Sequence, residues 1–435
     1  MNRLIFFLLC VIIFVLPLPL GSYRPWAIMS VGILITTIFF FHLLNSLFYD
    51  KPLYPPRYSW PVMAALLLVV SVCTVQIFSV SIDVYQTKQM LLKTTFMVIF
   101  CWLLFSYCNT AELIKKLIFI VVFTGVFQAL YASYLNLSPA ILSPIFSYQE
   151  TGRAIGTFTY ANFLANFLAL ILSLGIGLLI SELNRNNKVN LTLKQTLRNY
   201  SAVLLSSKII LRVSLIIIIV ALILTRSRMG NSAFFIALMA VSLLALFIYN
   251  NKPRSFKLMI VSFFIIDLIL IGALFDVDKV KQRLVETSIH SETRDEVVRD
   301  SIPLIIDKPL LGSGGGTFYT AFPAYQSGPY SGYYDNAHND YIQFAVELGL
   351  PTTAILGALV LYCLLLCIST MQKRKTSLFQ GVAFGCAIAI VAMLLHSLVD
   401  YSLQAGANSM LFILVLCIAI LSNKLPANIN SRQSF

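Results

Sequence analysis

Long apolar runs separated by short polar segments recur along the whole chain. A helix that crosses a lipid bilayer needs roughly 17 to 25 mostly apolar residues. About twelve segments fit this pattern: 4–20, 26–48, 60–80, 90–107, 113–135, 162–181, 209–224, 229–249, 256–275, 352–370, 378–398 and 409–421. The hydropathy pattern therefore predicts an all-α polytopic membrane protein with about 12 transmembrane helices, forming a single membrane domain over residues 1–435.

Composition supports this class. Of the 435 residues, 58% are hydrophobic and only 11% are charged, which is the balance of an integral membrane protein. The eight cysteines fall within or at the edges of the apolar runs, and none has the neighbours of a zinc site. We therefore predict neither a disulfide framework nor a bound metal.

The net charge of +13 indicates membrane topology rather than nucleic-acid binding. If the N-terminus is cytoplasmic and the chain alternates across twelve spans, one set of loops holds 19 of the 31 basic residues but only three of the 18 acidic ones. Basic residues accumulate in cytoplasmic loops. Both termini are therefore expected in the cytoplasm, and no nucleic-acid partner is expected.

Two polar segments are long. Residues 182–208 form a basic loop on the expected cytoplasmic side, and residues 276–340 form a loop subdomain on the opposite side, between the ninth and tenth spans. Within the second, residues 292–306 have the apolar spacing of a short amphipathic helix, with Asp295 and Arg299 placed for an i,i+4 ion pair. The following GSGGG run, 312–316, favours a tight turn over a phosphate cradle because no Lys-Ser/Thr pair follows it.

The stretch YDNAHNDYIQFAVELGLP, 334–351, concentrates polar side chains beside a membrane span. Asn339 or Asp340 is suited to cap a helix over about 341–348, with Gln343 as capping-box partner. We expect this helix at the membrane surface. His338 then precedes a helix N-terminus, whose partial positive charge favours a neutral imidazole that is able to act as a general base.

Several arginines fall on the same expected side. Arg226 and Arg228 share a turn of about five residues between two apolar spans. They either reach toward lipid headgroups or bind a diphosphate, for which planar guanidinium groups provide paired donors. Arg153 precedes the span that carries Asn162, and it serves either as an interfacial anchor or as a phosphate or glycan ligand.

His396 and Asp400 lie at i,i+4 near the end of a span on this side. They either form a helix-terminal contact or orient another group in the site. The sequence lacks a Walker A motif, a nucleotide-binding fingerprint and a paired-carboxylate motif. These absences point away from ATP-driven transport and from sugar-nucleotide chemistry, so we expect a lipid-linked donor and no cofactor.

Five segments resemble the bacterial O-antigen ligase and O-antigen polymerase superfamily of integral membrane glycosyltransferases. They are GRAIGTFTYANFLA, LTRSRMG, RDEVVRDSIPLIIDKPLLGSGGGTFYTAFPAY, NAHNDYIQFAVELGLP and HSLVDYSLQAGAN, within residues 152–421. The His-Asn pair followed by Glu-x-Gly is the most specific part. Relatives often carry a Trp soon after the arginine equivalent to Arg294, where this chain has Val297 and Val298.

The resemblance implies a metal-independent inverting transfer of a glycan from undecaprenyl diphosphate to an acceptor hydroxyl, most simply on lipid A core. His338 would activate the hydroxyl, and Arg228 and Arg294 would hold the diphosphate. Further expected site residues are, for substrate binding, Arg226 and Arg153, and, in support, Asn339, Asp340 and Asp400. The protein would lie in the bacterial inner membrane with its active site on the periplasmic face.

Alternatives remain within and outside this class. An O-antigen or exopolysaccharide polymerase and a protein O-oligosaccharyltransferase would use the same donor chemistry with different acceptors. A polysaccharide transporter or flippase would instead carry charged residues along a path through the membrane, whereas here nearly all charges lie in loops or at span ends.

Overall fold

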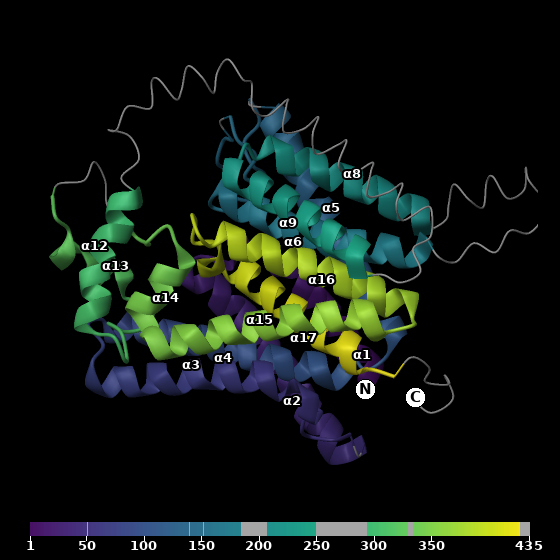
Figure 1. Cartoon of the computed structure of the whole chain (residues 1–435), viewed down its shortest axis with the longest axis horizontal. Coiled ribbons are helices and arrows are strands. Elements are labelled where there is room, and N and C mark those ends of the chain that lie inside the picture. Colours follow the sequence, from purple (N-terminus) through teal and green to yellow (C-terminus); the bar gives the residue numbers. More distant parts are fainter. Residues whose placement is uncertain are drawn as a thin grey trace, which may run out of the picture.

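The computed structural model describes residues 1–49, 51–138, 140–150, 152–183, 207–248, 294–328 and 334–426. Within these ranges the protein is all-helical and contains no strand. Figure 1 shows long, roughly parallel helices with a group of short helices gathered at one end. The all-α polytopic fold expected from the sequence is confirmed.

Among the described residues, eleven helices are apolar, and nine of them are long enough to be candidate spans. The eleven are α1 (Asn2–Val15), α2 (Pro25–Tyr49), α3 (Trp60–Ser79), α4 (Val84–Tyr107), α5 (Ala111–Leu137), α6 (Ala161–Leu183), α8 (Ser207–Leu224), α9 (Arg228–Ile248), α15 (Leu350–Lys373), α16 (Ser377–His396) and α17 (Gly406–Lys424). The short helices are α12 (Arg294–Asp307), α13 (Phe318–Ala321) and α14 (Asp340–Leu348), with 3-10 turns η1 (Leu20–Ser22), η2 (Arg57–Ser59), η3 (Phe322–Tyr325) and η4 (Ser402–Gln404).

Eleven of the twelve expected spans correspond to these helices, and the twelfth, 256–275, lies outside the described residues. By length and hydropathy, nine of the described helices are able to cross a membrane, while the apolar parts of α1 and α8 are shorter. The expected first span, 4–20, is wrong in its extent because α1 ends at Val15. Pro17 and Pro19 follow at once, and proline cannot continue a helix without losing a backbone hydrogen bond.

Three helices, α6, α16 and α17, form the centre of the bundle. The most apolar stretch of α6 is buried throughout, and α17 is nearly so. The crossing of α6 and α16 depends on glycine, since a Cβ on Gly177 would lie 2.4 Å from the carbonyl oxygen of Gly381 and 2.9 Å from Gly385. Small residues allow such close approach of membrane helices. Because neighbouring helices enclose α6, its side chains are mostly apolar on every face.

Polar contacts mark the two ends of this bundle. Near the last turn of α6, Glu182 pairs with Lys115 of α5 at 2.6 Å. Beyond the end of α15, Arg374 donates to the carbonyl of Asn423 in α17. The first turn of α6, with Asn162, lies at the opposite end, where the short helices gather.

The short helices have a small core of their own. Val297 and Leu304 of α12 pack with Phe318, Phe322 and Val346. The amphipathic helix expected within 292–306 is thus confirmed as α12. Its ion pair differs from the expectation, because Arg299 contacts Asp300 at 3.3 Å rather than Asp295.

Candidate functional site

His338 lies in an unusual backbone conformation just before α14. Its φ is +50°, a region that is costly for a residue with a side chain. The imidazole is half-buried and contacts two aromatic rings edge to face, that of Tyr401 at 4.7 Å and that of Tyr334 at 5.8 Å between centroids. The backbone and these rings together fix the direction of the imidazole.

The residues after His338 attach α14 to the loop between α16 and α17. Asn339 is the N-cap, with its side-chain oxygen accepting from the backbone N–H groups of Tyr341 and Ile342. Its amide also donates to the carbonyl of Leu398 at 2.8 Å. Asn339 therefore performs the expected capping role. It also holds residues 336–339, the His338 segment, against this loop.

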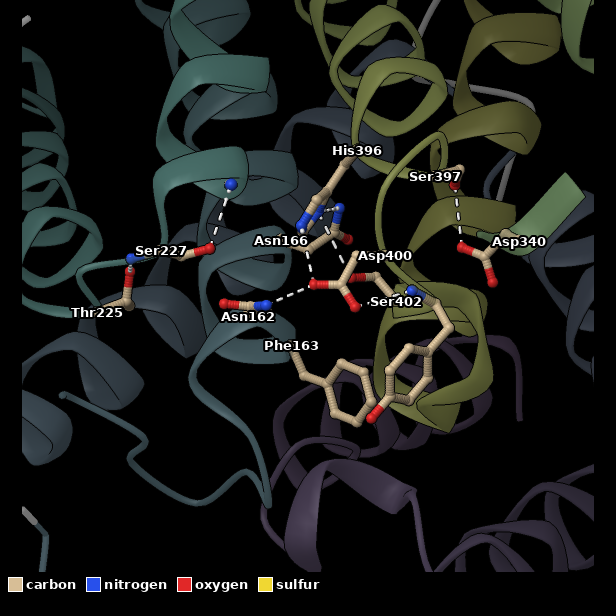
Figure 2. Close-up of polar contacts among 12 residues, drawn as sticks. Asn162, Phe163, Asn166, Thr225, Ser227, Asp340, His396, Ser397, Asp400 and Ser402 are labelled. Atoms are coloured by element: carbon tan, nitrogen blue, oxygen red, sulfur yellow. Dashed lines mark hydrogen bonds and ion pairs between the residues drawn. The ribbon is translucent and has the colours of Figure 1, made fainter. Parts of the chain in front are cut away.

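Asp340 does not cap the helix. It is buried, accepts a hydrogen bond from Ser397 at 3.0 Å (Figure 2), and receives the backbone N–H of Leu403. Burial raises the pKa of Asp340 to about 7, although these two hydrogen bonds oppose the shift. Gln343 and Glu347 of the same helix are buried as well. The apolar runs that flank this segment gave no sign that neighbouring elements would cover it.

A buried polar network connects α6 to the α16–α17 loop (Figure 2). The amide of Asn162 donates to Asp400 Oδ2 at 2.6 Å, and the amide of Asn166 contacts His396 Nδ1 at 2.7 Å. His396 Nε2 lies 3.6 Å from the same Asp400 oxygen. The expected contact between His396 and Asp400 is confirmed, and the asparagines of α6 complete it.

The network holds Asp400 as a carboxylate. Burial alone would raise its pKa, but the neighbouring His396, the backbone N–H of Tyr401 and the amide of Asn162 bring the pKa below its ordinary value. A buried carboxylate is stable only when its charge is compensated by such partners.

Arg153 extends this network to the turn between α8 and α9. Its Nη2 donates to Asn162 Oδ1 at 2.6 Å, and its Nε donates to the carbonyl of Thr225 at 2.9 Å. The guanidinium also lies 5.9 Å from the ring centroid of Tyr160. Arg153 is therefore a bridge within the site and not merely an interfacial anchor.

Arg226 and Arg228 lie beside Thr225 on a turn that alternates buried and exposed residues. Thr225 and Ser227 are buried, and Ser227 Oγ accepts the N–H of Gly230 in the first turn of α9. Both arginine side chains are exposed, and Arg226 has a φ of +47°. The buried residues hold the turn while the two cations remain accessible to a ligand.

Aromatic contacts link His338 to this turn. The ring of Tyr401 contacts that of His338 and also that of Tyr160, at 6.4 Å and an interplanar angle of 22°. Tyr160 in turn lies beside Arg153. His338 and Arg153, far apart in the sequence, thus belong to one continuous set of contacts. Arg294 begins α12, but its side chain lies outside the described residues.

Sequence reasoning missed Tyr160, Tyr401 and Glu347. Each lies inside one of the segments that resemble the superfamily. Tyr401 directly follows the predicted site residue Asp400, Tyr160 lies two positions before Asn162, and Glu347 is the acid of the Glu-x-Gly motif.

The glycine-rich turn behaves as expected. Gly314 has a φ of +118°, and the N–H groups of Gly314 and Gly315 bond to the carbonyl of Glu347 and to Gln76. These N–H groups are used within the protein, which confirms the turn and removes the phosphate-cradle alternative.

Among the residues that the structure describes, no three His, Cys, Asp or Glu side chains are arranged to share an ion. The site instead offers guanidinium groups, amides and one imidazole. These are groups that bind anionic oxygens and accept a proton from a hydroxyl.

Comparison with known proteins points to one family. Residues 213–357 match a family model described as O-Antigen ligase, and no curated protein matches the chain. The matched region runs from α8 into α15 and includes Arg226, Arg228, Arg294 and His338. Members of this family are glycosyltransferase-like enzymes that act on glycans and lipid-linked substrates. The protein is therefore a multi-pass membrane protein whose residues 213–357 are similar to the O-antigen ligase family.

Proposed function

We propose that this protein is an O-antigen ligase that transfers a glycan from undecaprenyl diphosphate to an acceptor hydroxyl on lipid A core. The observation that carries the proposal is the contact series from His338 through Tyr401 and Tyr160 to Arg153 and the α8–α9 turn. It joins a candidate base to a group of cations that suits a diphosphate. Both His338 and Arg226 have backbones in the left-handed region, and such strain gathers at functional sites.

In the proposed reaction, His338 takes the proton of the acceptor hydroxyl as its oxygen attacks the anomeric carbon. The bond between that carbon and the diphosphate oxygen breaks, and undecaprenyl diphosphate leaves with the electron pair. Attack from the face opposite the leaving group inverts the anomeric centre. The imidazolium then returns its proton to water.

The arginines stabilise the charge that develops on the leaving group. Arg228, Arg226 and Arg294 are assigned to the diphosphate, and each charge-assisted hydrogen bond contributes about 1.5 to 3 kcal/mol. Arg153 holds the turn by donating to the carbonyl of Thr225, and it is assigned to bind glycan or phosphate oxygens. Asp400, Asn339 and Asp340 position these groups and take no proton from the substrate.

We place the site on the periplasmic face of the inner membrane, with both termini in the cytoplasm. The charge asymmetry of the loops supports this orientation. So does the arrangement of the bundle, because the Lys115–Glu182 pair and Arg374 lie at the end opposite the site. Reporter fusions at the α8–α9 turn and at the C-terminus should report opposite sides of the membrane.

A deletion strain tests the function directly. Loss of a ligase removes all O-antigen from lipid A core, visible on a lipopolysaccharide gel, while lipid-linked polymer accumulates. The wild-type gene should restore the ladder and the His338→Ala gene should not. Loss of a polymerase would instead leave core with a single repeat unit. Unchanged lipopolysaccharide would contradict both assignments and favour capsule, exopolysaccharide or protein acceptors.

A further inference from the structure

A cavity of about 570 Å³ lies on the side of the His338 segment away from the α8–α9 turn. Its walls come from α2, α3, α4, α15 and α17, and α14 and the residues just before His338 close one end. In Figure 1, α3, α4 and α15 lie on one side of the central α6 and α16, and α8 and α9 lie on the other. The volume is that of a ligand site, and neither Arg153, Arg226 nor Arg228 lines it.

The cavity is amphipathic along its length. Its deeper wall is apolar and includes Leu66, Met97, Leu359 and Ile413. Its polar end includes Lys93 on α4 and Gln343 and Glu347 on α14. Gln86 and Met97 both line it, and eleven residues of helix span about 16 Å. A ligand that fits this space has a hydrocarbon part and a polar head.

Glu347 is a buried polar residue that lines the polar end of the cavity. It is 1% exposed, and its Oε1 accepts from the amide of Gln343 at 2.6 Å and from the N–H of Phe318. Its Oε2 is buried and has no hydrogen-bond partner among the described residues. A buried polar atom without a partner is costly, and a ligand hydroxyl or phosphate would satisfy it. Burial raises the pKa of Glu347 to about 7, so the acid form is available as a donor.

Lys93 adds a positive charge to the same end. Its Nζ donates to the carbonyl of Gln404 at 2.9 Å and approaches that of Leu403 at 3.5 Å. An ammonium group has three N–H donors, so these contacts fix its direction and leave capacity for a ligand. Arg24 is the other basic residue that lines the cavity. The polar end is therefore suited to an anionic head that also carries hydroxyl groups.

The cavity reaches the candidate base. Asn336 lines it, donates to Tyr23 Oη at 3.4 Å, and stands two residues before His338. Tyr23 packs on Phe163, which packs on Tyr401, the aromatic partner of His338. A head group held at Lys93 and Glu347 would thus approach the His338 segment from the side opposite the arginines.

We propose that this cavity binds the acceptor, an acyl-chain glycolipid with a phosphorylated sugar head, with its hydrocarbon against the wall of α3, α15 and α17 and its head at Lys93 and Glu347. The proposal rests on the proposed function. The acceptor fits better than the donor because a diphosphate requires several clustered cations, which the α8–α9 turn provides. The cavity mixes one buried ammonium with acid and amide groups, the combination that recognises sugar hydroxyls.

The test measures binding separately from transfer. The parent is full-length protein with His338→Ala in nanodiscs, and the probes are rough lipopolysaccharide, which carries lipid A core without O-antigen, and undecaprenyl diphosphate. Leu359→Trp fills the cavity, and Leu361→Trp on the exposed face of α15 is its matched control. Lys93→Gln removes the ammonium, and the exposed Lys88→Gln on the same helix is its control.

Leu359→Trp and Lys93→Gln should each weaken binding of rough lipopolysaccharide about tenfold, equivalent to about 1.4 kcal/mol, and leave undecaprenyl diphosphate binding unchanged. Both controls should bind like the parent. Ile413→Trp provides a second filled cavity should Leu359→Trp fail to give monodisperse protein. Arg226→Ala with Arg228→Ala should show the reverse selectivity.

Loss of undecaprenyl diphosphate binding in Leu359→Trp would overturn the proposal in favour of a donor cavity. Unchanged lipopolysaccharide binding in all cavity variants, or no binding by the parent, would also overturn it. Failure of the proposed function has a different signature, in which wild-type protein binds rough lipopolysaccharide through the cavity but transfers no glycan to it.

Discussion

The two sides of His338 differ in how their polar groups are held. On the arginine side, defined by Arg153, Asn162, Asp400 and the α8–α9 turn, side chains bond to one another in a buried network. On the cavity side, defined by Lys93, Glu347 and the apolar wall, polar groups cluster at one end and Glu347 Oε2 has no partner among the described residues.

Under the proposed function, this difference would serve two kinds of recognition. A network whose members fix one another presents its cations in a single arrangement, which suits the defined geometry of a diphosphate. An apolar wall with a few polar groups tolerates variation in hydrocarbon chains and selects by the head. His338 lies between the two sides, where a donor and an acceptor would meet.

The largest effect should come from His338, which both sides require. His338→Ala should lower transfer by at least about 10² to 10⁴, the usual contribution of a general base. Transfer of O-antigen to rough lipopolysaccharide, measured with purified components, reports it. Binding of both lipids should persist, and wild-type rates in this variant would remove His338 from the chemistry.

The next largest effect should distinguish the arginines of the α8–α9 turn from an exposed arginine elsewhere. Arg226→Ala and Arg228→Ala should each slow transfer by about 10- to 150-fold, because each removes about 1.5 to 3 kcal/mol of charge-assisted hydrogen bonding. Arg299→Ala is the control, since Arg299 is exposed and pairs with Asp300 in α12. Equal losses in all three variants would mean that the turn has no special role.

Asp400→Asn should loosen the arginine side without touching substrate. Removing one member of a buried pair is expected to cost about 3 kcal/mol of stability and to lower transfer about tenfold, with a smaller change in rough lipopolysaccharide binding. Thermal unfolding measures the loss of stability, and donor titrations measure how far the network supports donor binding. Asp307→Asn, an exposed acid that accepts from Tyr325, should behave like wild type. Unaltered donor binding in Asp400→Asn would show that the network does not position the arginines.

On the cavity side, the expected effect is on the pH dependence of stability rather than on transfer. Because burial raises the pKa of Glu347 from 4.5 to about 7, the folded protein binds a proton that the unfolded chain releases in this window. Stability should therefore fall as pH rises from about 4.5 to 7 and level off above it, by at most about 3 kcal/mol for this group at about 1.36 kcal/mol per pKa unit.

Glu347→Gln should flatten that slope, measured by thermal unfolding at a series of pH values. Asp340 contributes a slope of the same sign, so part of the dependence should remain. Glu296→Gln, at an exposed position of α12, should leave the slope unchanged. An identical slope in Glu347→Gln would mean that this carboxyl is already ionised in the folded protein.

Short-range patterns predicted the helices well. The lengths of the apolar runs located eleven of the described helices, and the amphipathic spacing in 292–306 located α12. The start of α14 was predicted to within one residue, with Asn339 or Asp340 as the cap, because capping depends only on the next three residues; the structure has Asn339. The extent of α1 was overestimated because apolar character continued past Val15, while the prolines that follow ended the helix.

The sequence by itself determined the class, the helices and the candidate residues, because length, hydropathy and local capping are properties of short segments. Only the tertiary structure decided which of them meet. Asn162 and Asp400 are separated by 238 positions, and the contact of His338 with Tyr401 depends on the packing of α14 against the α16–α17 loop. Such pairings are fixed by the close approach of helices such as α6 and α16, and no local pattern encodes them.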